Sequence, residues 1–182
     1  MQMIEIETSR LRLRPFAAGD VDEIHRLWTD PGVRKYIWDD EVIPREQAEA
    51  AVEESLAHFR DTGRGLWAAF PREGGEMLGF CGHWFFRDPP ELELLYGVAT
   101  KHWGKGLATE MSRAMIRYGF QELALARIVA STDAPNVASV RVMEKCGMSF
   151  DRRETVNGLD TIFYSIARDR FSASDAPYEL RR

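Results

Sequence analysis

The segment that most constrains the fold of this chain runs from residue 98 to residue 109 and reads Val-Ala-Thr-Lys-His-Trp-Gly-Lys-Gly-Leu-Ala-Thr. An apolar strand pattern precedes it, and apolar residues then recur every three or four positions, which predicts an amphipathic helix over 104–121. The first N–H groups of a helix have no partner inside it, and the helix dipole favours an anion there. Glycine lets a ligand approach the backbone, and Lys105 adds a positive charge. The segment therefore predicts a diphosphate site, with a helix start that binds no ligand as the alternative.

Three classes of phosphate site compete for this segment. A P-loop needs G-x-x-x-x-G-K-[ST], which does not fit because the two glycines stand two positions apart. A dinucleotide site needs G-x-G-x-x-G; Gly104 and Gly106 match it, but Thr109 stands where the third glycine belongs. The third class is acyl-coenzyme A binding, which the spacing alone leaves open.

The rest of the chain alternates between strand and helix patterns. We expect a strand that ends at Pro15, and then a helix that Asp20 caps together with Glu23. This helix stops near Asp30-Pro31-Gly32, residues 33–43 read as an aromatic and acidic linker, and a second helix starts around Pro44. Further elements are expected as strands at 66–70, 77–86, 91–98 and 127–132, a turn at Asp88-Pro89-Pro90, a helix at 136–146, and a hairpin over 148–168 that turns at Asn157-Gly158.

This order of elements predicts an α/β fold with one mixed, mostly antiparallel central sheet and helices on both faces. The chain has 182 residues, enough for one hydrophobic core. We expect a single domain over residues 1–170. The tail, residues 171–182, has little apolar content and is expected to fray or to lie on the surface.

Composition excludes several classes of function. The formal net charge of −5 disfavours a nucleic-acid partner, because an acidic surface repels phosphate backbones. No apolar run has the length of a membrane span or of a signal-peptide core. The two cysteines, Cys81 and Cys146, lack metal-ligand spacing. We therefore expect a cytoplasmic protein with no metal, no membrane and no nucleic-acid partner.

Three segments carry a family pattern in the correct order along the chain. They are Glu7–Phe16, Trp103–Ala108, and Asn136-x-x-Ser139 followed by Lys145–Met148. Together they resemble the GNAT superfamily of N-acetyltransferases, and within it the branch of ribosomal-protein N-terminal (alanine or serine) acetyltransferases, whose first strand Glu7–Phe16 resembles. The family's pyrophosphate motif is [Q/R]-x-x-G-x-[G/A], and the chain departs from it at the first position, which is Trp103. The resemblance covers roughly residues 7–168.

The resemblance implies the GNAT acyl-CoA N-acyltransferase fold and direct transfer of an acetyl group from acetyl-CoA to a primary amine, with no covalent enzyme intermediate. A homodimer is a family-level expectation. Coenzyme contacts are then expected at Val98, Trp103, Gly104, Lys105, Gly106, Leu107, Ala108, Thr109, Asn136 and Ser139.

Catalytic roles follow from the chemistry and from the resemblance together. An amine attacks only when neutral, so a base must take its proton, and the developing oxyanion needs a donor. The resemblance implies Glu93 as the base, acting through a water, and the backbone N–H of Val98 as the oxyanion donor. Glu91 on the same strand is the reserve base, and a partly exposed strand residue paired to an arginine is the alternative for Glu93. Many family members carry a tyrosine acid where this chain has Met143, which has no proton to give. Ser139 is then the candidate acid.

The acceptor site is expected to combine carboxylates and aromatic rings that suit a cationic amine. Its candidates are Trp38, Asp40, Glu41, Trp84 and Glu91, and ordinary loop or core roles are the alternative for each. The acceptor amine belongs to a peptide or to a small molecule.

A rival function comes from a different class. A catalytically silent acyl-CoA-binding module, serving as a sensor or as a partner-binding unit, would also keep the diphosphate segment, and Met143 in place of the family tyrosine favours it. Glu93 and Ser139 favour the enzyme.

Overall fold

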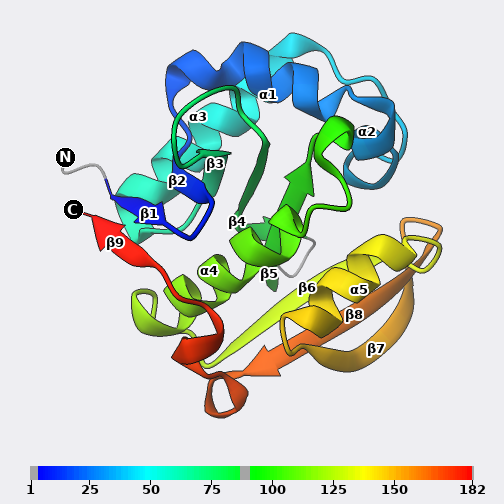
Figure 1. Cartoon of the computed structure of the whole chain (residues 1–182). Coiled ribbons are helices and arrows are strands. Elements are labelled where there is room, and N and C mark those ends of the chain that lie inside the picture. The colour runs from blue at the N-terminus through cyan, green and yellow to red at the C-terminus, as the bar shows by residue number, and fades with distance from the viewer. Residues whose placement is uncertain (1–3, 87–90, 182) are drawn as a thin grey trace.

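A computed structural model describes residues 4–86 and 91–181 and shows one continuous sheet flanked by helices (Figure 1). The strands in chain order are β1 (Glu5–Glu7), β2 (Leu11–Pro15), β3 (Leu66–Pro71), β4 (Gly79–Phe86), β5 (Glu91–Val98), β6 (Arg127–Asp133), β7 (Ser149–Val156), β8 (Leu159–Ala167) and β9 (Glu179–Arg181). The α-helices are α1 (Val21–Trp28), α2 (Pro31–Ile37), α3 (Arg45–Thr62), α4 (Leu107–Gln121) and α5 (Val137–Lys145), with short 3-10 turns at Ala18–Asp20, Thr100–His102, Arg168–Arg170 and Ala173–Asp175.

The nine described strands form a sheet of order β7-β8-β6-β5-β4-β3-β2-β1-β9. Neighbours pair antiparallel except at the centre, where β5 and β6 run parallel. Their pairing among the described residues is confined to Glu93 opposite Val129. The mixed, mostly antiparallel α/β fold expected from the sequence is confirmed.

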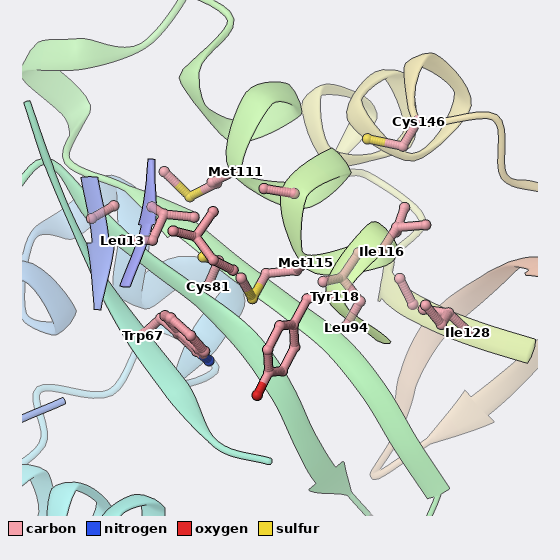
Figure 2. Close-up of a cluster of buried hydrophobic side chains, with 14 of the residues drawn as sticks. Leu13, Trp67, Cys81, Leu94, Met111, Met115, Ile116, Tyr118, Ile128 and Cys146 are labelled. Atoms are coloured by element: carbon pink, nitrogen blue, oxygen red, sulfur yellow. The ribbon is translucent and has the colours of Figure 1, made fainter. Parts of the chain in front are cut away.

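Helices cover both faces of the sheet, because side chains alternate across each strand. In β3, Trp67 and Ala69 face the side of α4 and α5, whereas Ala68 and Phe70 face α1 and α3. Figure 2 shows the first of these clusters, with Met111 and Met115 of α4 directed toward β2, β3 and β4. The packing fixes α4 across the centre of the sheet and so places its N-terminus beside the end of β5.

The structure corrects two predictions in the N-terminal region. Part of the linker at 33–43 is helical, because Asp30 does not end the helical region but caps α2: its side chain accepts a hydrogen bond from the N–H of Gly32. Asp20 does not cap α1 with its side chain. It instead accepts two hydrogen bonds from Arg14, both at 2.7 Å, and one from the N–H of Ala17.

The C-terminal tail is the third correction. Residues 179–181 form β9, which pairs with β1 at the edge of the sheet, so this part of the tail is neither frayed nor merely draped. Ala176 is buried, and Arg117 of α4 lies over the ring of Tyr178. The expected turn at Asp88-Pro89-Pro90 lies outside the described residues.

Candidate active site

The interrupted pairing of β5 and β6 opens a cavity of about 410 Å³ beside the ends of both strands. Its walls come from residues 94–98, the loop after β5, and parts of α2, α4, α5 and β6. Lys105, although described, is not among the lining residues. Of the residues expected to contact the coenzyme, the cavity is lined by Val98, Trp103, Gly104, Gly106, Leu107, Ala108, Thr109, Asn136 and Ser139.

The backbone of Val98 points into the gap between the strands. Val98 lies opposite Gly79, and the N–H of Ala99 donates to the carbonyl of Leu78. This is the pattern of a non-hydrogen-bonded antiparallel pair, which turns the N–H and C=O of Val98 away from β4. The indole Nε1 of Trp103 donates to the Val98 carbonyl oxygen at 2.7 Å. The Val98 N–H thus faces the cavity side of β5.

The start of α4 forms an electropositive cradle, residues 104–109. Gly106 caps the helix with φ +75°, a left-handed conformation that favours glycine. The N–H groups that follow have no partner inside the helix. Burial lowers the pKa of His102, the neighbouring charges of Lys105 and Lys101 lower it further, and Glu76 opposes them. Free N–H groups and positive charge at the entrance of a cavity suit a diphosphate.

The cradle is held from behind by the segment that precedes β2. Arg10 donates to the carbonyl of Lys105 at 2.8 Å, and Glu110 of α4 accepts from the N–H of Arg10 at 2.9 Å and from Thr8 Oγ1 at 2.6 Å. Burial alone would raise the pKa of Glu110, but the hydrogen bonds from Thr8 and Arg10 outweigh it and bring that pKa below its usual value. A stable carboxylate therefore anchors the first turn of α4.

Helix α2 supports the same loop from the other side. Asp30 accepts a hydrogen bond from Thr100 Oγ1 at 2.7 Å. A Cβ at Gly32 would lie only 2.8 Å from the ring of Trp103, so a glycine is needed for this close approach. Val33, Tyr36 and Ile37 also line the cavity, so α2 forms one wall of the site. These three residues lie in the segment that was expected to be a linker.

Glu93, the expected base, lies inside the sheet next to the gap. It is 1% exposed and accepts a hydrogen bond from Ser131 Oγ at 2.6 Å. Ser131 lines the cavity, whereas Glu93 does not. Ser131 therefore offers a path for a proton between the cavity and Glu93.

Ser139 has a partner that sequence reasoning missed. Its hydroxyl lies 2.8 Å from the hydroxyl of Tyr96, and both residues line the cavity. Burial raises the pKa of Tyr96 well above its usual value, so the phenol keeps its proton. Met143, at the position of the family tyrosine, is 1% exposed in the hydrophobic core. Asn136 caps α5 by accepting from the N–H of Ser139 at 3.3 Å.

The residues expected at the acceptor site do not line the cavity. Asp40 forms an ion pair with Arg34, and Glu91 forms one with Arg152. Glu41 is exposed. The rings of Trp38 and Trp84 pack against those of Trp28 and His58, at centroid distances of 5.4 and 5.7 Å. A role for any of them in binding the acceptor stays a prediction.

Comparison with known proteins agrees with this geometry. Residues 10–149, more than half of the chain, match the acetyltransferase (GNAT) domain family. The chain belongs to the GNAT acetyltransferase family. It is 30% identical to the FsC-acetyl coenzyme A-N(2)-transacetylase of Aspergillus fumigatus over an alignment of 197 positions, gaps included, that covers 97% of this chain and 81% of the relative. The expectation of an N-acetyltransferase enzyme is thereby confirmed.

Solved structures of GNAT proteins share the fold. The acetyltransferase (GNAT family) from Bacillus anthracis superposes with a TM-score of 0.76 and 25% identity, over 91% of this chain and 99% of that one. The ribosomal L7/L12 α-N-protein acetyltransferase RimL, solved in complex with coenzyme A, gives a TM-score of 0.75 over 90% of this chain and 97% of its own, at 17% identity. At that identity the likeness to RimL concerns the fold.

Within residues 4–86 and 91–181, no helix is both long enough and apolar enough to cross a bilayer. The same ranges hold no group of three or more His, Cys, Asp or Glu side chains arranged for a metal ion.

Proposed function

We propose that this GNAT acetyltransferase transfers an acetyl group from acetyl-CoA to a primary amine by direct attack within a ternary complex. The observation that carries the proposal is the cavity itself, which joins the cradle at residues 104–109 to the backbone of Val98 and to the hydroxyl of Ser139. An elongated coenzyme could place its pyrophosphate on the first turn of α4 and its thioester beside Val98. The name of the A. fumigatus relative, an acetyl coenzyme A transacetylase, supports the choice of donor.

In this proposal a residue of the chain assists each chemical step of the transfer. Glu93 receives the proton of the attacking amine through Ser131 or a water, since an α-amine with a pKa of about 8 is largely protonated at neutral pH. The N–H of Val98 donates to the oxygen that becomes negative as the amine nitrogen bonds to the carbonyl carbon. The carbon–sulfur bond then breaks, and Ser139 gives a proton to the sulfur.

The acceptor amine would enter along α2. Val33, Tyr36 and Ile37 give that wall an apolar and aromatic surface, which suits the side chain or peptide backbone next to the reacting nitrogen. The names of two similar proteins support a nitrogen acceptor, since RimL is named for a protein α-amine and the A. fumigatus relative is named an N(2)-transacetylase. We therefore propose a peptide α-amine or a small-molecule primary amine.

Initial-rate kinetics test this mechanism. Coenzyme A release is measured while acetyl-CoA and one amine are varied together, using an alanine-initiated peptide, spermidine or lysine. Direct attack in a ternary complex predicts double-reciprocal lines that intersect. Parallel lines would indicate an acetylated enzyme and would contradict the mechanism.

The silent acyl-CoA-binding module remains the second candidate, because Met143 has no proton to give. The hydroxyl pair of Tyr96 and Ser139 favours the enzyme, since it supplies protons beside the cavity. Tight binding of acetyl-CoA without coenzyme A release on any of the three amines would favour the module.

A further inference from the structure

Two hydroxyl groups from distant parts of the chain meet at the cavity. Tyr96 lies on β5, two positions before Val98, and Ser139 lies in the first turn of α5. Their hydroxyl oxygens are 2.8 Å apart, and both residues line the cavity. This contact belongs to the site of the proposed function, yet neither the motif spacing nor the family resemblance assigns a role to Tyr96.

The distances allow either hydroxyl to donate, and the relay uses one of the two arrangements. The phenol oxygen of Tyr96 is 2.8 Å from Ser139 Oγ and 3.2 Å from the Ser139 carbonyl oxygen, so both oxygens are within reach of the phenol proton. A serine hydroxyl has one proton and two lone pairs. When Tyr96 donates to Ser139 Oγ, the proton of Ser139 stays available for a group in the cavity. Burial of the phenol raises the pKa of Tyr96, which keeps that donor proton in place.

We propose that Tyr96 and Ser139 form a proton relay to the departing sulfur, with Tyr96 in the place of the missing family tyrosine. The inference rests on the proposed function. As the amine nitrogen bonds to the acetyl carbon, the carbon–sulfur bond breaks and its electron pair stays on sulfur. Sulfur takes the proton of Ser139, Ser139 takes the proton of Tyr96, and the phenolate regains a proton from solvent. The amine's own proton leaves through Glu93, so charge and protons balance.

The relay gives Ser139 a phenol partner that can replace its proton. A phenol has a reference pKa of about 10, and burial raises the pKa of Tyr96 above it, so the phenol gives up its proton only as Ser139 passes its own to the sulfur. Cys146 has no part in the relay, because its thiol is directed to the carbonyl oxygen of Thr109 at 3.7 Å. Met143 offers no proton.

The test is a double-mutant cycle on the full-length enzyme, with acetyl-CoA and whichever of the three amines the wild type acetylates. Tyr96→Phe removes only the hydroxyl. We expect kcat to fall about 10- to 100-fold, with KM for acetyl-CoA changed less than about threefold, because the relay acts on the leaving sulfur. Ser139→Ala should cost as much, and the double variant no more than the worse single one.

Two variants control for folding and for loss of any tyrosine hydroxyl. Ser139→Thr keeps a hydroxyl and should retain kcat within about threefold, which a purely steric role of Ser139 would not predict. Tyr164→Phe removes an exposed hydroxyl that lies 3.4 Å from Glu144, outside the cavity lining, and should leave kcat unchanged. Thermal melting of each variant shows that it is folded.

Three results would overturn the inference. Wild-type kcat in Tyr96→Phe would remove Tyr96 from the reaction, and single losses that multiply in the double variant would mean that the two hydroxyls act separately. Equal losses in Ser139→Thr and Ser139→Ala would exclude proton donation by Ser139. A wild type that binds acetyl-CoA but acetylates none of the amines would instead refute the proposed function, and the relay with it.

Discussion

Glu110 anchors the first turn of α4, and its contacts determine how much stability the chain should lose when its charge is removed. Its carboxylate holds Thr8 and Arg10 against the first turn of α4 and is 14% exposed, whereas Arg10 is 50% exposed. Glu110→Gln keeps the shape and removes the charge. A hydrogen bond to a charged group contributes about 1.5–3 kcal/mol net and a neutral one roughly half of that. The exposed ion pair with Arg10 adds about 0–1 kcal/mol.

The expected loss is therefore about 2 kcal/mol at pH 7, mainly from the weakened bonds to Thr8 and to the N–H of Arg10. For a chain of this size that corresponds to a fall in Tm of about 4–8 °C. The assay is thermal unfolding followed by circular dichroism. Glu76→Gln is the control. Both side chains of the ion pair between Glu76 and Lys101 are exposed, so this substitution should leave Tm unchanged.

The pH dependence makes the test sharper. Because the fold lowers the pKa of Glu110 below its usual value of 4.5, its stabilisation is fully present above that value and is lost as pH falls through the folded pKa. The difference in Tm between wild type and Glu110→Gln should shrink as pH is lowered from 7 to about 3.5. A difference that stays constant over this range, or no difference at pH 7, would refute the reasoning.

Three further predictions concern the cavity and its rim. Gly106→Asp should weaken acetyl-CoA binding, measured by calorimetry, at least about 100-fold, because it adds negative charge to the cradle. Gly158→Asp is the control, since it imposes the same backbone strain in a hairpin turn and should leave the affinity unchanged. Equal affinities in the two variants would count against the pyrophosphate site. Glu93→Gln should lower the rate below pH 8 far more than the affinity for acetyl-CoA, and an unaltered pH–rate profile would remove Glu93 as the base. Burial and two neighbouring carboxylates raise the pKa of Asp133, so its charged form destabilises the fold above the unfolded pKa. Asp133→Asn should therefore raise Tm at pH 7 and give no gain in Tm below about pH 3.8. A lower Tm of this variant at pH 7 would contradict the raised pKa of Asp133.

Local signals predicted most of the fold. The Asn157-Gly158 pair turns the last hairpin as expected, with φ values of +50° and +82°, since both positions need a left-handed backbone. Helix α4 was also readable from its apolar spacing, but it begins at Leu107 after a Gly106 cap and not at residue 104 as expected. Helix α2 was readable but missed: an aspartate before a proline is a helix start as well as a stop, and Asp30 with Pro31 forms that start.

Long-range contacts were not predictable from the sequence. β9 is a strand of three residues whose partner, β1, lies at the opposite end of the chain, and such a short strand has no pattern of its own. The strand predicted at 91–98 contains Tyr96, but nothing in its pattern indicates Ser139 as the partner of that residue. The clamp between Arg10 and Glu110 likewise depends on how α4 packs on the sheet. These tertiary contacts refine the candidate site, which the motifs alone located only along the chain.

Mass spectrometry of the acceptor tests the central claim most directly. The purified enzyme is incubated with acetyl-CoA and, in separate reactions, an alanine-initiated peptide, spermidine and lysine. Our account predicts a singly acetylated product from at least one amine, in amounts equal to the coenzyme A released, and loss of that product in Gly106→Asp but not in Gly158→Asp. Acetyl-CoA binding that depends on Gly106, with no acetylated product from any amine, would contradict the account.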